Sequence, residues 1–496
     1  MATSVYVNNA PTQTPGSYTA IDASGLLTQG LGASGIVAVI GQATGAASYA
    51  AVGQNAAALP VFTTTQQALN TFTGGDLLDG VGMLFDPSSD PNLTGGASVV
   101  VACKVNPSAQ SGLVLNSATG AAVALTSQAY GAQANALTAT VVTGSTANTV
   151  ALALSNTATG AAEFFDNLGS SAAVISAVNT SSVLATALLA PFAVATAPLV
   201  NAAAQPFIGG SDTASATFTD WQNCLNLLKQ LRVNSVVALT SDPSIASAVQ
   251  AHCSYMCGQG QSERDGFVGI QNGSGTLATL AQIKQQTLAL NSRHIRACVQ
   301  NVSLFNSKGV LTVFPPHFLA CMAAGMQAGA PVGFPLTNKY IKAQAIAQDP
   351  GFNPLDNSND LIAAGALVAR RVDGQGIRWV RNVTTYQQDN NLAFVEGSVN
   401  EAVNYAAFTL RNALQFAIGR PGFSGTANAI KSTAYNVLDQ LITSGAIRGY
   451  NSLTITPVAD AYQISLALAP VLPVNFIVTT IHLSLTVGAQ GAAAAA

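Results

Sequence analysis

Residues 233–239, Val-Asn-Ser-Val-Val-Ala-Leu, stand just before Asp242 and Pro243–Cys257, and this pair of segments decides the fold class. The first segment is apolar and rich in valine, which favours a buried strand. In the second, an aspartate precedes a proline at the first helical position, which is typical of a helix start. The same alternation continues in segments 266–270, 276–290, 297–304, 310–314 and 316–328. It predicts an α/β fold with a largely parallel sheet covered by helices on both faces.

A segment of different residue composition interrupts this alternation of strands and helices. Residues 26–104 already have an α/β pattern, with strands expected at 36–40 and 98–103 and a threonine-capped helix at 63–72. From Pro107 to about residue 204, Gly, Thr, Ser and Asn become frequent, and short β-prone runs are separated by turn residues. Because the α/β pattern resumes afterwards, we expect a small β domain inserted into the α/β domain.

The C-terminal part has its own pattern of helices and strands. Long helices are expected at 392–417 and 428–444, short strands at 367–372 and 376–385, and a strand-like segment at 452–468. The whole chain is thus expected to divide into an extended N-terminal arm at 1–25, the first part of the α/β core at 26–106, an inserted β-rich outer domain at 107–205, the main part of the core at 206–355, a C-terminal α+β inner domain at 356–472, and a C-terminal strand arm and tail at 473–496.

Charged side chains are scarce. They make up 8 % of the 496 residues, against about 25 % in typical soluble domains. A free monomer normally stays apart from its neighbours through surface charge, so this composition suits a subunit buried in a larger assembly. Residues 1–228 contain one base and nine acids, whereas residues 229–448 contain 17 bases and 11 acids. The basic part is too dilute for a nucleic-acid surface and better fits a face toward an acidic protein partner.

Membrane and redox signals are weak. Residues 183–204 approach transmembrane length but contain two prolines and no flanking Lys or Arg, so we expect no membrane insertion. The N-terminus lacks the basic region and apolar core of a signal peptide, and the six cysteines are expected to be reduced thiols of a protein made in a cytoplasm. Gly30–Gly35 matches a dinucleotide-binding pattern, but the strand follows the glycines instead of preceding them.

Two groups of residues could form a metal or phosphate site, and each also has a simpler structural interpretation. Cys253, Cys257, His294 and Cys298 have helical spacings that could bind zinc if the segments met, but buried thiols and ordinary histidines are the simpler interpretation. The arginines at 370, 371, 378 and 381 could hold a phosphate, although a basic face for ion pairs is favoured. The sequence contains no nucleophile elbow, Walker motif or zinc-protease motif. We therefore expect no enzyme activity, no catalytic residues, no metal and no cofactor.

The last apolar segment, Val474–Val487, has strand propensity along its whole length. Such a strand at a chain end exposes edges that pair with other chains. It could lie within a sheet of its own domain, or it could add to a sheet of a neighbouring subunit. The segment itself leaves both possibilities open.

The ordered set of segments resembles one family, the contractile phage tail sheath proteins, which also occur in related injection machines. The segments that carry the resemblance are Gly35-Ile-Val-Ala-Val-Ile-Gly-Gln42, the helix near 64–72, Tyr130-Gly-Ala-Gln-Ala-Asn135, Glu163-Phe-Phe-Asp-Asn-Leu168, Val313-Phe-Pro-Pro-His-Phe-Leu-Ala-Cys-Met-Ala-Ala-Gly-Met326, Pro335-Leu-Thr-Asn-Lys339, Leu367-Val-Ala-Arg-Arg371 and Phe476-Ile-Val-Thr-Thr-Ile481. No single motif is specific. The resemblance covers nearly the whole chain, and it departs from the family in the charge-poor β insert and the alanine tail.

The resemblance implies a subtilisin-like core without its catalytic triad, and arms that pair with a sheet in adjacent subunits. It assigns strand exchange to Val5, Tyr6, Val7, Phe476, Ile477, Val478, Thr479, Ile481, Leu483 and Leu485, and ion pairs between subunits or with a tube to Arg370, Arg371, Arg378, Arg381, Glu401 and Arg411. The implied function is a subunit that stacks as hexameric rings around an inner tail tube and contracts to drive the tube through a host envelope.

The implied partners are copies of the chain itself, the inner tail tube protein, and baseplate and tail terminator proteins, without direct contact to nucleic acid. The implied location is the virion, after assembly in the bacterial cytoplasm. Helix 392–417 is expected to face the tube, and the β insert to face outward. Two alternatives remain: another self-assembling shell or surface-layer protein, which would form sheets or closed shells, and a hydrolase on a subtilisin-like core, which would react with a serine-directed probe.

Overall fold

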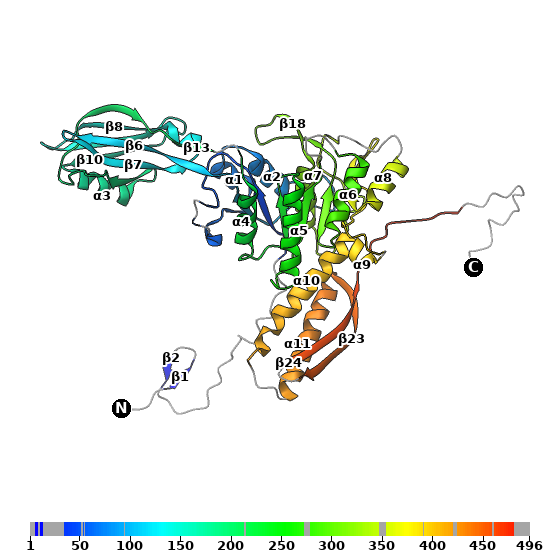
Figure 1. Ribbon diagram of the computed structural model, residues 1–496. Helices are drawn as coiled ribbons and strands as arrows, with labels where there is room; N and C mark the ends of the chain where they lie inside the picture. The colour runs from blue at the N-terminus through cyan, green and yellow to red at the C-terminus, as the bar shows by residue number, and fades with distance from the viewer. Residues whose placement is uncertain are drawn as a thin grey trace, which may run out of the picture.

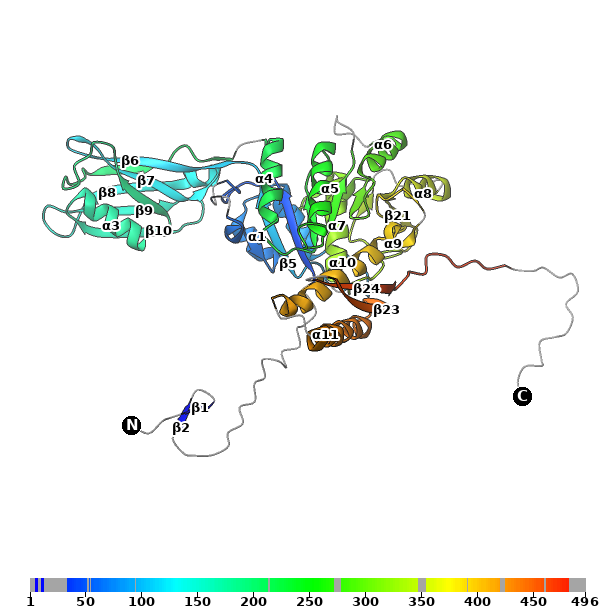
Figure 2. The ribbon, with the colours of Figure 1, turned by 60° about the horizontal axis from the view of Figure 1, so that its bottom comes forward.

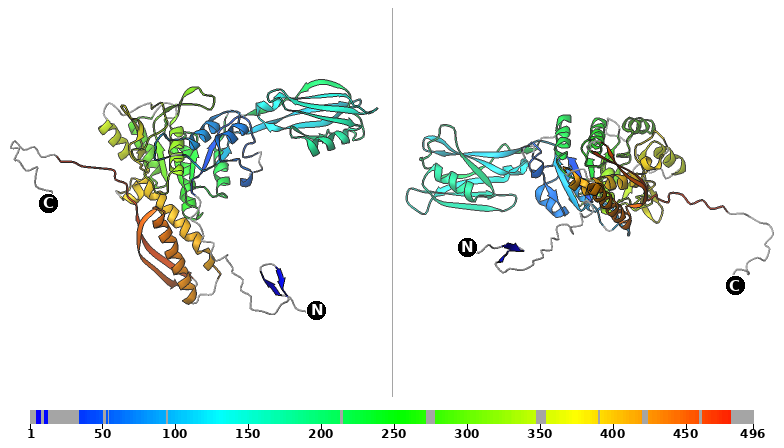
Figure 3. Two further views of the ribbon diagram at one scale, coloured as in Figure 1. Left: turned by 180° about the vertical axis from the view of Figure 1, so that it is seen from behind. Right: turned by 90° about the horizontal axis from the view of Figure 1, so that it is seen from below.

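The computed structural model contains three folded units (Figure 1). It describes residues 5–7, 10–12, 34–50, 53, 55–93, 95–212, 215–271, 278–346, 354–389, 391–419, 424–458 and 461–480. A central α/β core carries an insert on one side and a helical unit with a β-hairpin below it (Figure 1). Views from behind and from below show that the insert stands away from the core (Figure 3). Near the N-terminus, strands β1 (Val5–Val7) and β2 (Ala10–Thr12) pair with each other.

The core is built on a seven-stranded sheet with the order β20-β16-β15-β14-β3-β5-β4. The strands are β3 (Ile36–Gly41), β4 (Val61–Phe62), β5 (Val99–Lys104), β14 (Ser235–Ala238), β15 (Asp265–Gly269), β16 (Ile295–Cys298) and β20 (Ala366–Leu367). All neighbours pair in parallel except β4, which is antiparallel to β5. The predicted α/β class with a largely parallel sheet is therefore confirmed.

Helices cover both faces of this sheet, and successive residues of β3 show why. Val37 and Val39 point into one apolar cluster, whereas Ala38 and Ile40 point into the other. The first cluster is closed by α2 (Asp76–Phe85) and α7 (Pro316–Gly329), with α1 (Thr65–Thr71) beside α2. The second is closed by α4 (Phe218–Leu228), α5 (Pro243–Cys257) and α6 (Leu280–Leu290), which lie along one side of the sheet in Figure 2, with α8 (Pro354–Ala363) beside α6.

The insert is a sandwich of two four-stranded sheets with its own apolar core. Its strands are β6 (Ser108–Ser117), β7 (Gly120–Tyr130), β8 (Leu137–Thr143), β9 (Val150–Asn156), β10 (Ala162–Leu168), β11 (Ala185–Leu189), β12 (Ala202–Pro206) and β13 (Ser211–Asp212), and α3 (Ser171–Ser181) packs beside them. The apolar stretch 183–204 contributes β11 and β12 to these sheets. Within the described residues, no helix is long and apolar enough to cross a membrane.

Two short sheets flank the core. Their strands differ from two strands that the sequence predicts. The strand expected at 297–304 is divided between β16 and β17 (Val302–Phe305), and β17 joins a different sheet with β18 (Leu311–Phe314) and β19 (Ala345–Ile346). The division occurs at Gln300, whose side-chain amide exchanges two hydrogen bonds with the backbone of Ala369. The strand expected at 376–385 ends early, as β22 (Gly376–Trp379) paired with β21 (Ala369–Val372).

The C-terminal unit packs two long helices against a β-hairpin. Its elements are α9 (Leu392–Val395), α10 (Gly397–Leu414), the 3-10 turn Gln415–Ala417, α11 (Ser424–Thr443), β23 (Ile447–Val458) and β24 (Ala461–Pro470). The single helix expected at 392–417 is wrong, because the backbone of Glu396 is extended and separates α9 from α10. Residues 471–480 leave this unit outside any strand. The sequence left open whether segment 474–487 forms a strand in a sheet of its own domain. Residues 474–480 form no strand, so this alternative is wrong for them. Residues 481–487 lie outside the described residues.

A buried ion pair holds the insert to the core where the chain passes between them. Lys104 ends β5 just before the chain enters the insert, and Asp212 lies in β13, where the chain returns. Lys104 Nζ lies 2.6 Å from Asp212 Oδ1 and also donates to the carbonyl oxygens of Gly45 and Ala46. The two side chains are 1 % and 10 % exposed. One contact thus ties both crossing segments together.

Replacing Lys104 with methionine should destabilise this junction. Removing one partner leaves the Asp212 carboxylate without its counter-charge in a buried place, which typically costs about 3–5 kcal/mol. Differential scanning calorimetry should show an unfolding transition at a clearly lower temperature. The control Lys342→Met removes an exposed pair with Asp86 and should change stability by less than about 1 kcal/mol. Equal effects of the two substitutions would contradict this account.

Candidate functional site

The C-terminal unit meets the core along α10, and this helix has two chemically different faces. Tyr405, Ala406 and Ala413 point into the apolar cluster that α10 shares with α11 and the hairpin. Asn400 and Asn404, four residues apart and therefore on one face, point toward the core and hydrogen-bond to it. The C-terminal unit therefore has its own apolar core, and one face of α10 makes polar contacts with the main body.

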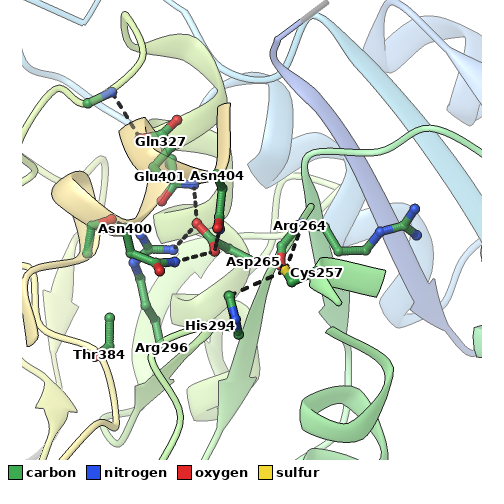
Figure 4. A network of polar contacts seen from close by, with 12 residues as sticks. Cys257, Arg264, Asp265, His294, Arg296, Gln327, Thr384, Asn400, Glu401 and Asn404 are labelled. Atoms are coloured by element: carbon green, nitrogen blue, oxygen red, sulfur yellow. Dashed lines mark hydrogen bonds and ion pairs between the residues drawn. The ribbon is translucent and has the colours of Figure 1, made fainter. Parts of the chain in front are cut away.

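Asp265, the first residue of β15, is the centre of this contact (Figure 4). Its Oδ1 accepts hydrogen bonds from the Nδ2 atoms of Asn400 (2.8 Å) and Asn404 (3.0 Å). Its Oδ2 accepts from Arg296 Nη1 (3.0 Å) and from Gln327 Nε2 of α7 (3.2 Å). Asp265 is 2 % exposed, so one buried carboxylate joins β15, β16, α7 and α10. A buried charge is tolerated when it is paired and hydrogen-bonded in this way.

Arg296 extends the contact to the start of α10. It is fully buried in β16, and its Nη2 donates to the carbonyl oxygen of Gly397, the first residue of the helix. A Cβ atom at position 397 would lie 2.4 Å from Arg296 Nε and 2.5 Å from Asn382 Oδ1. Glycine is needed here because the guanidinium passes directly against the backbone. The helix start and the arginine thus fix each other.

Glu401 lies at the same junction and has an unusual protonation equilibrium. Its Oε2 accepts a hydrogen bond from the backbone N–H of Gly333 (3.3 Å). Burial raises the pKa of Glu401 to about 8, and the nearby positive charge of Arg296 opposes this shift only in part. The side chain is therefore mostly protonated at neutral pH, and the neutral form suits its position between α10 and the core.

A second ion pair lies further along α10. Arg411 Nη2 and Nη1 donate to Glu263 Oε1 (2.6 Å) and Oε2 (3.0 Å), which is a two-pronged contact between the helix and the core. Glu263 is 4 % exposed and Arg411 is 33 % exposed. Next to this pair, the guanidinium of Arg232 lies 3.6 Å from the ring centre of Phe408 on α10. The C-terminal unit is thus attached along the length of its first helix.

A third polar cluster lies at the root of the C-terminal arm. Arg381 Nε lies 3.5 Å from Glu396 Oε2, and Asn475 Nδ2 donates to the same oxygen at 3.2 Å. An open groove of about 790 Å³ adjoins this cluster, with Arg370, Arg381, Tyr386, Asn475 and Phe476 among the residues that line it. The structure thus brings two of the predicted arginines together with the start of the predicted arm.

The predicted residues do not all line this groove. Arg370, Arg371 and Arg378 are on the β21–β22 hairpin, and Arg378 hydrogen-bonds to Asn338 and Tyr340. Phe476, Ile477 and Val478 are exposed by 77–89 %, and Thr479 is also exposed. Val5, Tyr6 and Val7 form β1, whereas Ile481, Leu483 and Leu485 lie outside the described residues.

The sequence interpretation missed the residues that hold the junction: Asp265, Arg296, Asn400, Asn404 and Glu396. One signal was available, since an aspartate beginning a buried strand and two asparagines spaced by four on an amphipathic helix are unusual choices for core positions. Their mutual contact joins elements far apart in the sequence and could not be read from spacing alone.

The cysteines and histidines considered for zinc lie in the core. Cys257 Sγ is 3.4 Å from His294 Nδ1, but the described residues contain no group of three or more His, Cys, Asp or Glu side chains placed to hold a metal ion. His317 Nδ1 is 3.0 Å from Ser241 Oγ. Burial lowers the pKa of His252 and His317 to about 3 and that of His294 to about 4, so all three rings are neutral at physiological pH.

Comparisons with known proteins find similarity to tail sheath proteins. No protein-family profile matches the sequence. A tail sheath protein of Bacillus phage SP01 is 26 % identical over 284 residues, which are 56 % of this chain and 47 % of that protein. The chain therefore spans about half the length of this curated relative. The sheath tail protein of Desulfitobacterium hafniense superposes with a TM-score of 0.64 at 14 % identity, over 92 % of this chain and 100 % of the other.

A second solved structure, the sheath tail protein Lin1278 of Listeria innocua, superposes with a TM-score of 0.63 at 14 % identity, over 88 % of this chain and 96 % of the other. The resemblance to the tail sheath family is confirmed. At 14 % identity the two superpositions establish a shared fold, and they extend over almost the entire length of both sheath tail proteins.

In this sheath-like chain, stability should depend on pH through Glu401. Between its ordinary pKa near 4.5 and about 8, the folded state keeps a proton that the unfolded state has released, so stability falls as the pH rises through this range. Glu401→Gln removes the titrating group. Its melting temperature should therefore exceed that of the unmodified chain at pH 8.5 and approach it at pH 5. A constant difference at both pH values would contradict the assignment.

Asp265→Asn should lower the stability of the chain, whereas Glu401→Gln should raise it at alkaline pH. The new amide group would face at least one of the four donors and would leave the Arg296 charge without a partner, for an expected loss of about 3–5 kcal/mol. Urea unfolding followed by tryptophan fluorescence measures this loss, because Trp379 is buried in the core. Glu401→Gln is the matched carboxyl-to-amide control in the same junction. An Asp265→Asn variant as stable as that control would show that the network contributes little.

Proposed function

We propose that the chain is the structural subunit of a contractile tail sheath and that its copies are tied together by exchanged strands. The observation that carries this proposal is the C-terminal arm. Val474, Phe476, Ile477 and Val478 are exposed by 77–89 % and lie outside the folded body. A monomer gains nothing from extending such apolar side chains into water, whereas an assembly buries them. The shared fold with sheath tail proteins supports the same function.

The β23–β24 hairpin supplies a suitable acceptor for such an arm. It is a sheet of two strands in the described part of the chain, with helices α10 and α11 packed nearby. A two-stranded ribbon is only marginally stable alone, and its free edges can pair with added strands. We infer that arms of neighbouring copies, including Val5–Val7 and residues 476–485, add to this ribbon.

The finer features of the proposal follow the resemblance. Hexameric rings would stack around an inner tail tube and would shorten on a signal from the baseplate, with a terminator protein at the far end. The particle would be a virion or phage-tail-derived machine assembled in the bacterial cytoplasm. The core would be subtilisin-like and non-enzymatic, with the insert outward and the C-terminal unit toward the tube, and the domain boundaries would be those expected from the sequence.

The charged residues divide into two groups in this proposal. Arg411, Glu401 and Arg381 already make contacts inside the chain. Arg371 is exposed and Arg370 is half-buried on the β21–β22 hairpin. We therefore infer that Arg370 and Arg371 are the better candidates for exchangeable ion pairs between subunits or with the tube, and that Arg378 positions this hairpin through Tyr340.

Truncation after Pro473 tests the proposal. The full chain should form tubes or stacked rings in negative-stain electron microscopy, with or without an added tube protein, and the truncated chain should remain monomeric. Circular dichroism should show that both are folded, because residues 474–480, the described part of the removed segment, lie outside any helix or strand. If both chains stay monomeric even with the tube protein, the sheath function is wrong. If both form tubes, the sheath function stands and the strand exchange is wrong.

A further inference from the structure

The C-terminal arm is attached to the body by two successive residues near its root. Within 471–480, Pro473 and Asn475 are half-buried, and the other residues are exposed. Asn475 Nδ2 donates to Glu396 Oε2 at 3.2 Å, and the ring centre of Phe476 lies 5.8 Å from the guanidinium of Arg381. The exposed segment 476–480 is thus held at its root by two specific contacts.

Glu396 is built into the body so that it can act as a fixed anchor. It separates α9 from α10, and its backbone N–H donates to Leu392 O while it pairs with Val383 in an isolated bridge. Its side chain is 1 % exposed. Arg381 is 20 % exposed and lies 3.5 Å from the same carboxylate oxygen that accepts the arm's hydrogen bond. The carboxylate therefore cannot turn away from the arm without losing its counter-charge.

We propose that Glu396, Arg381 and Asn475 form a latch that fixes the direction in which the C-terminal arm leaves the subunit. This inference rests on the proposed function, because it assigns positioning residues to the exchanged arm. Glu396 and Arg381 act from the body, and Asn475 is the matching residue of the arm. Phe476 adds a contact of its ring with the Arg381 cation.

Such a latch has a clear physical purpose in assembly. An extended segment that pairs with another chain loses conformational freedom on binding, and this loss lowers the affinity. Holding the root in the bound direction removes part of that loss before the partner arrives. The latch is also reversible, since it consists of one hydrogen bond, one ion pair and one ring contact, and the adjacent open groove of about 790 Å³ leaves space beside the arm.

Exchanging the two partners of the hydrogen bond gives a direct test in the full-length chain. Asn475→Asp places a second carboxylate against Glu396 and should release the arm. Adding Glu396→Gln to the same chain restores a donor–acceptor pair, because the glutamine amide can donate to the carboxylate introduced on the arm, and Arg381 can pair with that carboxylate. The two variants have the same arm sequence, so the double variant is the matched control.

The readout is the rate at which chymotrypsin cleaves after Phe476 in the dilute monomer, followed by mass spectrometry of the released C-terminal peptide. We expect Asn475→Asp to be cleaved at least about fivefold faster than the double variant, the ratio that about 1 kcal/mol produces. A second pair, the unmodified chain and Arg381→Gln, also shares one arm sequence, and the variant should again be cleaved faster. Because Arg381→Gln keeps Glu396, this second pair still tests the latch if the double variant is unstable.

Equal cleavage rates within both pairs would overturn the latch. This readout is made on monomers and does not depend on assembly, so it is separate from the test of the sheath function. An unmodified chain that shows the latch but never assembles would contradict the sheath function alone. A chain that assembles, with equal cleavage within both pairs, would contradict the latch alone. Faster assembly of the double variant than of Asn475→Asp would support both.

Discussion

The buried carboxylate of Asp265 is the constraint on which the arrangement of the C-terminal unit depends. It receives four hydrogen bonds from side chains on β16, α7 and α10, and it balances the charge of the fully buried Arg296. Apolar contacts alone would allow α10 to slide or rotate on the core, because they have no directional preference. Directional hydrogen bonds favour one register of α10 on the core, and α10 in turn packs against α11 and the hairpin.

Charge is used sparingly in this chain and is concentrated where units meet. Five ion pairs occur among the described residues, and four of them lie at a junction. Lys104 and Asp212 join the insert to the core, whereas the pairs of Arg296, Arg381 and Arg411 lie where the core meets α10 or the arm. The fifth, Lys342 with Asp86, is exposed. With only 8 % charged residues in the chain, four of these five ion pairs lie where units meet.

Sequence reasoning succeeded where the cause of structure is local. The start of α5 follows from Asp242 and Pro243, which determine where a helix can begin. It failed where a distant side chain decides. Gln300 ends β16 by bonding to Ala369, and Glu396 interrupts the expected long helix at a position that also contacts Arg381 and Asn475. No proline or glycine stands beside Gln300, whereas Gly397 directly follows Glu396 and was an available signal. The pattern of apolar residues nevertheless continues across both interruptions.

One of these failures, at Glu396, coincides with a residue that we propose to anchor the arm. The junction residues are polar groups in buried positions, and each is stable only because its partners arrive from other elements. A change at one partner therefore affects several units at once, whereas a change in an apolar cluster stays within its own unit. If the subunit changes its contacts within an assembly, the apolar clusters of the core, the insert and the C-terminal unit can persist, and the rearrangement can be confined to the exposed arm and the exchangeable charges beside its root. The polar junctions of the structure and the proposed anchor of the arm thus both depend on buried polar residues whose partners come from other elements.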